Sequence, residues 1–176
     1  MKVALAMAVT LLAFAPAADL KIGEPVSDVT LGKDSLAALT KEGKVVAVYF
    51  WSCDCPYGPP NYANIKAADD KFAGNDKVKI VIVSSSGEPE AKGTAWVKDQ
   101  GIKAAFIHDG DRKIAKHFVP KKVNATFVVD AKGNLVYRGG IANDKGNLLI
   151  EAINAALEGK EAPKSDQKFE GCGIRS

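Results

Sequence analysis

Apolar residues along the chain fall into two alternating patterns. The runs at 45–51 and 78–83 consist almost entirely of consecutive apolar, β-branched and aromatic residues, which is typical of strands buried on both faces. The stretch 62–72 between them has apolar residues at helical spacing, so it is predicted to form an amphipathic helix. This order of strand, helix and strand predicts a layered α/β domain.

The later part of the chain continues both patterns. In a helix predicted over 88–100, Ala91, Ala95 and Trp96 are spaced to face the core. The other predicted elements are strands over 104–107, 126–129 and 135–138, and helices over 111–118, capped by Asp111, and over 147–157. A short polar turn separates the last two strands, so they predict a hairpin that adds antiparallel strands to a parallel sheet.

Length, composition and charge narrow the class of protein. A chain of 176 residues suits one domain. Its 47% hydrophobic and 26% charged residues exclude a disordered tail, a collagen-like fibre and a disulfide-packed miniprotein. With 24 Lys and Arg against 21 Asp and Glu, the net charge of +3 is too balanced to predict nucleic-acid binding.

The first residues have the pattern of a targeting segment. A single lysine precedes an uncharged run over 3–14, which is too short for a membrane-spanning helix of about 20 apolar residues. Ala-Pro-Ala at 15–17 then offers the small-x-small pattern of a signal peptidase site. We therefore expect a signal peptide over 1–17, cleaved after Ala17 or Ala18, and no stable membrane span.

The remaining chain divides into a domain over 18–159 and a polar tail over 160–176 that carries Cys172. All three cysteines remain after the expected cleavage, so we expect a periplasmic or secreted protein, in a compartment where disulfides form and persist. Because three is an odd number, at least one thiol lacks an intramolecular disulfide partner.

The other two cysteines, Cys53 and Cys55, lie at the predicted end of the strand 45–51 and before the next helix. In open α/β sheets, functional groups collect where strands end and helices begin. Unpaired backbone N–H groups and the helix dipole stabilise a thiolate there, and a thiolate is the nucleophilic form of cysteine. The pattern predicts a redox-active site.

The residues around these cysteines resemble the thioredoxin superfamily. The segment 50–56 (FWSCDCP) after a buried strand is similar to the secreted redoxin branch, which contains TlpA-like thiol oxidoreductases and peroxiredoxin-like proteins. The segments 22–31, 126–139 and 171–174 resemble the entry segment, the strand-turn-strand close and the GCxI ending of such proteins. The resemblance implies a thioredoxin-like α/β fold, with a central mixed sheet flanked by helices, and no cofactor or metal.

The resemblance also implies roles for single residues. Cys55 aligns with the attacking cysteine of the superfamily, and Pro56 follows it. Ser52 takes the place of a peroxiredoxin threonine and is expected to donate a hydrogen bond to a peroxide or thiolate. Trp51 is expected to shield the site or to pack in the core. The second cysteine of a CxxC motif would fall at Gly58, so that motif is broken.

Three further positions depart from the superfamily pattern. Asn124 stands where thioredoxins carry a cis-proline and peroxiredoxins an arginine. Since cis peptide bonds are largely confined to proline, we expect a trans bond there, and an amide supplies no charge. Pro59 and Pro60 fit only the first turn of a helix, so the helix is predicted to start near Pro59 rather than at Pro56.

Cys172 is a candidate partner for the cysteines of the loop. The residues 160–171 ahead of it span roughly 40 Å when extended, which is about the diameter of such a domain. Cys172 could therefore form a fixed disulfide or act as the resolving thiol for Cys55. A disulfide between Cys53 and Cys55 is a third option, strained because one residue separates them.

These observations predict a thiol–disulfide oxidoreductase in which Cys55 is the nucleophile and Cys53 or Cys172 resolves the mixed disulfide. Its expected partners are protein thiols or disulfides and a reducing partner that the sequence does not name. A peroxiredoxin-like thiol peroxidase acting on peroxide is the first alternative. The others are a Cu(I) chaperone that uses Cys53 and Cys55, and a redox-inactive domain held by a Cys172 disulfide.

Overall fold

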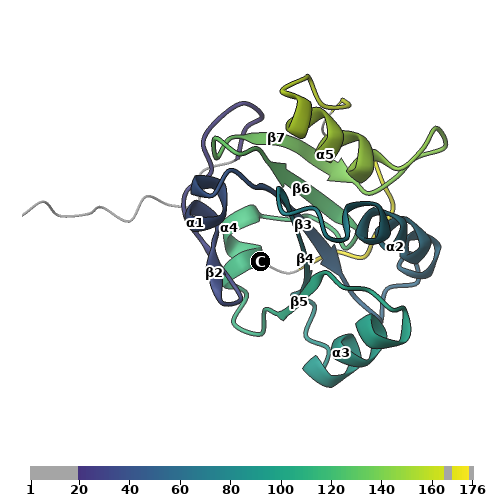
Figure 1. The fold of residues 1–176 in the computed structure, drawn as a ribbon. Helices are drawn as coiled ribbons and strands as arrows, with labels where there is room; N and C mark the ends of the chain where they lie inside the picture. Colours follow the sequence, from purple (N-terminus) through teal and green to yellow (C-terminus); the bar gives the residue numbers. More distant parts are fainter. Residues whose placement is uncertain (1–19, 165–167, 175–176) are drawn as a thin grey trace, which may run out of the picture.

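The structure is a computed structural model that describes residues 20–164 and 168–174 (Figure 1). The expected signal peptide, 1–17, lies outside the described residues. None of the helices in the described part of the chain is long and apolar enough to cross a membrane. In chain order the elements are β1 (Thr30–Leu31), β2 (Asp34–Ser35), α1 (Leu36–Lys41), β3 (Val45–Trp51), α2 (Pro59–Phe72), β4 (Val78–Ser84), α3 (Glu90–Asp99), β5 (Ala105–His108), α4 (Lys113–Phe118), β6 (Ala125–Val129), β7 (Leu135–Gly140) and α5 (Leu148–Glu158).

Five of these strands form one mixed sheet in the order β5-β4-β3-β6-β7. The pairs β3–β4 and β4–β5 are parallel, whereas β6 runs antiparallel to both β3 and β7. The strands β1 and β2 form a separate antiparallel pair. The predicted mixed sheet, with its antiparallel hairpin late in the chain, is confirmed.

The central strand β3 is buried along its whole length because helices cover both faces of the sheet (Figure 1). Its side chains alternate between two cores. The α4-side core, formed with α1 and α4, takes Val46, Val48 and Phe50. The α2-side core, formed with α2 and α5, takes Val45, Ala47, Tyr49 and Trp51. Because β3 ends at Trp51, it delivers the loop with Cys53 and Cys55 to one end of the sheet.

The helix α3 corrects one expectation about which side chains face the core. Ala91 and Ala95 are exposed, whereas the half-buried Trp96 packs against the α2-side core as expected. The buried residue of this helix is Gly93, where an added Cβ would lie 2.0 Å from the ring of Phe106. The aromatic side chain therefore packs against the backbone of α3, and this close approach turns the alanines outward.

The start of α4 corrects a second expectation. Asp111 accepts a hydrogen bond from the Lys113 backbone N–H and forms an ion pair with the Lys113 ammonium group. The buried Asp109 carboxylate accepts from the backbone N–H groups of Ile114 and Ala115, at 3.0 and 2.9 Å. Asp109 therefore satisfies the free N–H groups inside the first turn, and it also accepts a hydrogen bond from the Ser85 hydroxyl at 2.7 Å.

Candidate redox site

The loop between β3 and α2 holds two of the three cysteines. The helix α2 begins at Pro59 with Gly58 as its cap, as the two prolines predict, because a first-turn residue needs no N–H donor. A turn precedes the helix, in which the Gly58 N–H donates to the Cys55 carbonyl at 2.8 Å. Cys55 therefore lies one turn ahead of the helix rather than at its first residue, and Pro56 is exposed.

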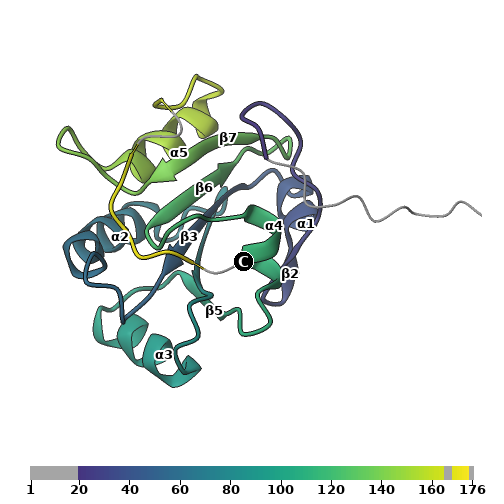
Figure 2. The same cartoon turned by 180° about the vertical axis from the view of Figure 1, so that it is seen from behind.

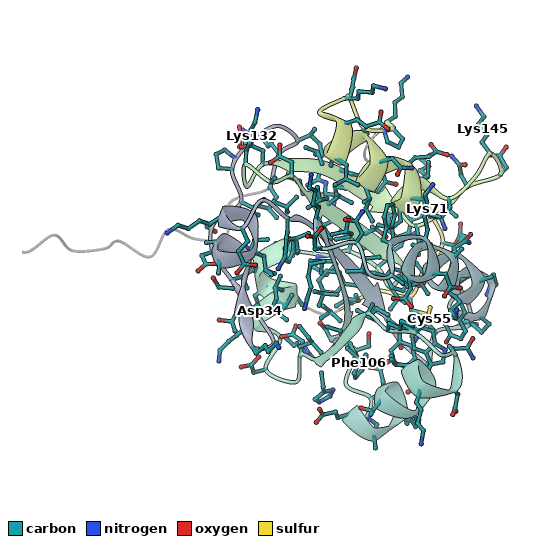
Figure 3. All side chains as sticks on the ribbon, viewed as in Figure 1. Asp34, Cys55, Lys71, Phe106, Lys132 and Lys145 are labelled. Atoms are coloured by element: carbon teal, nitrogen blue, oxygen red, sulfur yellow. The ribbon has the colours of Figure 1, made fainter. Side chains whose placement is uncertain are left out.

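Cys55 is buried at the end of the sheet and belongs to the α4-side core. In Figure 3 its label lies between α2 and α3. Its sulfur accepts a hydrogen bond from the backbone N–H of Cys172, with 3.1 Å between nitrogen and sulfur. The two cysteines are 117 positions apart in sequence. All three cysteines of the chain are free thiols in this structure.

The tail holds Cys172 in place by pairing with the segment before β6. The Val123 N–H donates to the Cys172 carbonyl at 2.8 Å, and Lys122 and Gly173 form an antiparallel bridge. Ile174 is buried in the α4-side core. Figure 2 shows this yellow tail passing from the α5 side of the molecule to the side of α4. The tail thus lies across the end of the sheet like a short added strand.

The proximity of the two thiols changes the acidity of the tail cysteine. The hydrogen bond with Cys55, followed by burial, raises the pKa of the Cys172 thiol to about 11. At neutral pH Cys172 therefore keeps its proton and remains available as a donor to the Cys55 sulfur. Both the N–H and the S–H of Cys172 converge on that atom.

Cys53 has different surroundings, although it is only two residues from Cys55. It packs half-buried against the α2-side core. Its backbone N–H donates to the Glu88 carboxylate at 3.2 Å, and its sulfur lies 3.4 Å from Asp54 Oδ1. Burial, followed by the hydrogen bond to Asp54, raises the pKa of the Cys53 thiol. The loop therefore directs Cys53 and Cys55 into opposite cores.

Asn124 connects three parts of the site. Among the described residues no peptide bond is cis, as expected at this position, and Asn124 instead adopts a left-handed conformation with φ 71°, which asparagine tolerates better than most residues. Its buried amide oxygen accepts from the Tyr49 hydroxyl at 2.7 Å. Its amide nitrogen donates to the Tyr57 carbonyl at 2.9 Å and to the Glu170 carbonyl at 3.2 Å. One side chain thus joins the core, the cysteine loop and the tail.

The other predicted supporting residues have structural contacts. The Ser52 hydroxyl accepts a hydrogen bond from the Asp54 N–H at 3.2 Å and shapes the loop. Trp51 is fully buried in the α2-side core, where its ring lies 4.7 Å from that of Trp96 between centroids. Trp51 therefore packs in the core on the side of Cys53 and not on the side of Cys55.

Sequence reasoning missed Glu88 and Tyr49 as residues of this site. The buried Glu88 carboxylate accepts from the Cys53 N–H and from the Ser84 hydroxyl, the latter at 3.0 Å. Its position after the end of β4 was the available signal, since that end lies beside the end of β3 in a parallel pair. Tyr49 gave no signal because it lies inside an apolar strand. Among the described residues, no group of three or more His, Cys, Asp and Glu side chains could hold a metal ion.

The sequence matches a known family over most of its length. Residues 13–138 match the AhpC/TSA family, and the chain belongs to this family. The resemblance to the redoxin branch is thereby confirmed, and membership supports a general redox role. No curated protein matches the sequence.

Solved structures share the fold. A hypothetical protein from Sinorhizobium meliloti 1021 is 22% identical with a TM-score of 0.76, covering 88% of this chain and 94% of its own. A candidate protein disulfide isomerase from Bacteroides thetaiotaomicron is 23% identical with a TM-score of 0.65, covering 79% and 91%. A candidate thiol:disulfide interchange protein DsbE from Chlorobium tepidum is 17% identical with a TM-score of 0.62, covering 80% and 97%. The thioredoxin-like fold is confirmed.

Proposed function

We propose that the protein is a thiol–disulfide oxidoreductase in which Cys55 attacks a partner disulfide and Cys172 resolves the product. The observation that carries this proposal is the 3.1 Å contact between the Cys172 backbone nitrogen and the Cys55 sulfur. Membership of the AhpC/TSA family supports redox chemistry in general. The tail supplies a second thiol in place of the missing CxxC partner, because Gly58 stands where that motif would carry its second cysteine.

The first step is attack of the Cys55 thiolate on one sulfur of a disulfide in a partner protein. A bond forms between that sulfur and Cys55, the partner's disulfide bond breaks, and the leaving thiolate takes a proton from water. Cys172 cannot compete for this step, since its hydrogen bond with Cys55 raises its pKa to about 11. In this proposal, the contact between the two thiols makes Cys55 the nucleophile and Cys172 the resolving thiol.

The second step is attack of Cys172 on the Cys55 sulfur of the mixed disulfide. Once Cys55 is bound to the partner, its sulfur is part of a disulfide, and the thiol–thiol hydrogen bond that is the chief cause of the raised pKa of Cys172 is lost. Cys172 then loses its proton, forms the Cys55–Cys172 disulfide and releases the partner's second thiol. Two electrons and two protons have passed to the partner, and an external dithiol reductant restores the starting state.

Cys53 is a poor resolving thiol in this arrangement. Its sulfur lies beside Asp54 on the α2-side core, while Cys55 belongs to the α4-side core. The same separation disfavours a Cu(I) site built from Cys53 and Cys55. A peroxidase is disfavoured because Asn124, at the position where peroxiredoxins carry an arginine, supplies no charge.

Mapping disulfides in the oxidised protein tests the proposal. We expect mass spectrometry after mild oxidation to show a Cys55–Cys172 linkage, and the reduced protein to reduce insulin catalytically with a dithiol reductant. Turnover of peroxide without insulin reduction would support the peroxidase instead. Tight Cu(I) binding that needs Cys53 would support the chaperone, and a disulfide that resists reduction would support the redox-inactive domain.

We further propose that the chain is exported, with a domain over 18–159 and a tail over 160–176. The short uncharged run and the Ala-Pro-Ala pattern support export. N-terminal sequencing of protein from the periplasmic or secreted fraction should give Ala18 or Asp19 as the first residue. Mature protein that begins at Met1 would contradict the cleavage.

A further inference from the structure

The tail covers the residue that the proposed reaction needs. Cys55 is only 2% exposed while the tail is in place, and its sulfur contacts the Cys172 backbone. A sulfur of a partner protein has no access to Cys55 until the tail moves. The tail is held without a covalent bond, since Cys172 is a free thiol. The partner and the tail must therefore compete for one place.

The tail is held by the backbone of the segment 121–123, which offers hydrogen-bonding groups to an extended peptide. Its Val123 N–H donates to the Cys172 carbonyl, and its Lys121 carbonyl accepts from the Ile174 N–H at 3.3 Å. Removing the tail would leave these backbone groups unpaired. Another extended segment satisfies them by adding a strand in the same way.

Side-chain fit sets which sequences this edge accepts. An added Cβ at Gly171 would lie 2.0 Å from the Val123 carbonyl oxygen, so only glycine fits directly before the cysteine. Phe169 packs so closely on Gly140 that an added Cβ there would lie 2.6 Å from it. Ile174 is buried in the α4-side core. The edge therefore selects an aromatic residue, glycine, cysteine and an aliphatic residue, at the spacing found in 169–174.

The charge around the same place favours an acidic residue in the bound segment. A cavity of about 670 Å³ continues beyond Phe169, and four of its lining residues are basic and one is acidic. The lining residues are Val119, Lys121, Lys122, Ala125, Phe127, Arg138, Gly139, Lys168, Phe169 and Glu170. The tail adds Lys168 to this basic lining, ahead of its aromatic residue. A segment with an acidic residue at that position would complement the charge better.

We propose that this edge, formed by 121–123 and Gly140, is the docking surface for the partner protein, and that the tail is its resident competitor. The partner is an extended segment with an acidic residue, an aromatic residue, and a Gly-Cys pair followed two positions later by an aliphatic residue. The proposal rests on the proposed function only for the chemistry that follows docking. Return of the tail then both delivers Cys172 and displaces the product.

Glycine variants of the full-length chain provide a matched test. Gly171→Ala should lift the tail, whereas Gly173→Ala is the control, because nothing lies within 4 Å of an added Cβ at that residue. We expect Cys55 in Gly171→Ala to react with a neutral alkylating reagent about tenfold faster than in the wild type. Gly173→Ala should match the wild type. An unchanged rate in Gly171→Ala would overturn the proposal.

The second measurement uses fluorescent peptides with the sequence of residues 168–174 and serine at the cysteine, so that no thiol chemistry occurs. By fluorescence anisotropy, Gly171→Ala should bind this peptide about tenfold more tightly than the wild type or Gly173→Ala. Glutamate in place of the first lysine should tighten binding, and alanine in place of the glycine before the serine should abolish it. Gly140→Ala should expose Cys55 yet fail to bind the peptide.

The two proposals can fail separately. If the peptide does not bind Gly171→Ala although Cys55 is accessible there, the docking surface is wrong while insulin reduction can still occur. If the peptide binds as expected but the wild type reduces no disulfide, the docking surface stands and the proposed oxidoreductase does not. Binding that is indifferent to the glycine position would also overturn the docking proposal.

Discussion

Cys53 and Cys55 are separated by one residue and meet different parts of the molecule. Cys55 is buried in the α4-side core and is in contact with the tail through Cys172. Cys53 packs against the α2-side core, and its neighbours are the carboxylates of Asp54 and Glu88. Cys55 thus has a second thiol beside it, whereas burial, followed by the hydrogen bond to Asp54, raises the pKa of the Cys53 thiol.

The cause of this difference is the course of the backbone after β3. The Ser52 hydroxyl holds the Asp54 N–H, and the Cys55 carbonyl holds the Gly58 N–H. This tight turn reverses direction before α2 begins, so two nearby side chains reach opposite sides of the sheet. Spacing in sequence is therefore a poor guide to which thiols react together.

The largest expected effect comes from exchanging serine for each of the two cysteines. Cys55→Ser should lower insulin reduction by about a thousandfold or more, since it removes the nucleophile. Cys53→Ser should leave turnover within about twofold, because nothing in the proposed reaction uses that sulfur. Steady-state insulin assays on the two variants check this. If both variants lose activity equally, the functional contrast between the two cysteines is wrong.

The next effect concerns the tail thiol. Cys172→Ser should slow turnover by about ten- to a hundredfold and cause a Cys55–partner adduct to accumulate, because the mixed disulfide has no resolving thiol. Non-reducing electrophoresis and mass spectrometry of the reaction mixture detect the adduct. Normal turnover without an adduct would remove Cys172 from the mechanism and leave Cys53 to be tested as its replacement.

Substitutions of Asn124 test how much its hydrogen bonds to the core, the cysteine loop and the tail contribute to the stability of the protein. Asn124→Gly should lower the free energy of unfolding by about 2–3 kcal/mol, because the buried Tyr49 hydroxyl loses its acceptor and two carbonyls lose a donor. Asn124→Ala should cost about 1 kcal/mol more, since alanine is strained at φ 71°. Denaturant unfolding measures both. Equal stabilities for wild type and Asn124→Ala would contradict this role.

The smallest expected effect is a shift in titration. In the reduced wild type the Cys172 thiol should ionise near pH 11, with its pKa raised chiefly by the hydrogen bond with Cys55. Because the folded chain holds this proton more tightly than the unfolded chain, the contribution to stability is complete below the ordinary pKa of a thiol. It is lost as the pH rises toward 11.

In Cys55→Ser the pKa of Cys172 should fall back toward its ordinary value, because the chief cause of the shift is removed. The measurement is thiolate absorbance during an alkaline titration. Both proteins that are compared, with and without Cys55→Ser, also carry Cys53→Ser, so that the Cys53 thiol does not contribute to the absorbance. A Cys172 titration that ignores the Cys55 substitution would contradict the contact between the two thiols.

The sequence predicted the scaffold of this site better than its contacts. The apolar run of β3 and the start of α2 at Pro59 match the structure, because burial on both faces and proline geometry are local properties. Of the expected core positions of α3, Ala91 and Ala95 were wrong, since Phe106 of a distant strand packs against the helix at Gly93. The third, Trp96, packs against the α2-side core as expected. The roles of Cys55 and Cys172 stay predictions, although the structure places the two residues together.

What the sequence determined by itself was the order of strands and helices from β3 onward, the late hairpin and the family. Each of these leaves a periodic or motif pattern within a few consecutive residues. Only the tertiary structure decided that Asn124 joins loop and tail, that Glu88 holds the Cys53 backbone, and that Cys172 covers Cys55. These contacts join segments between 35 and 117 positions apart, and pairing over such separations depends on how the sheet and its two cores bring the segments together.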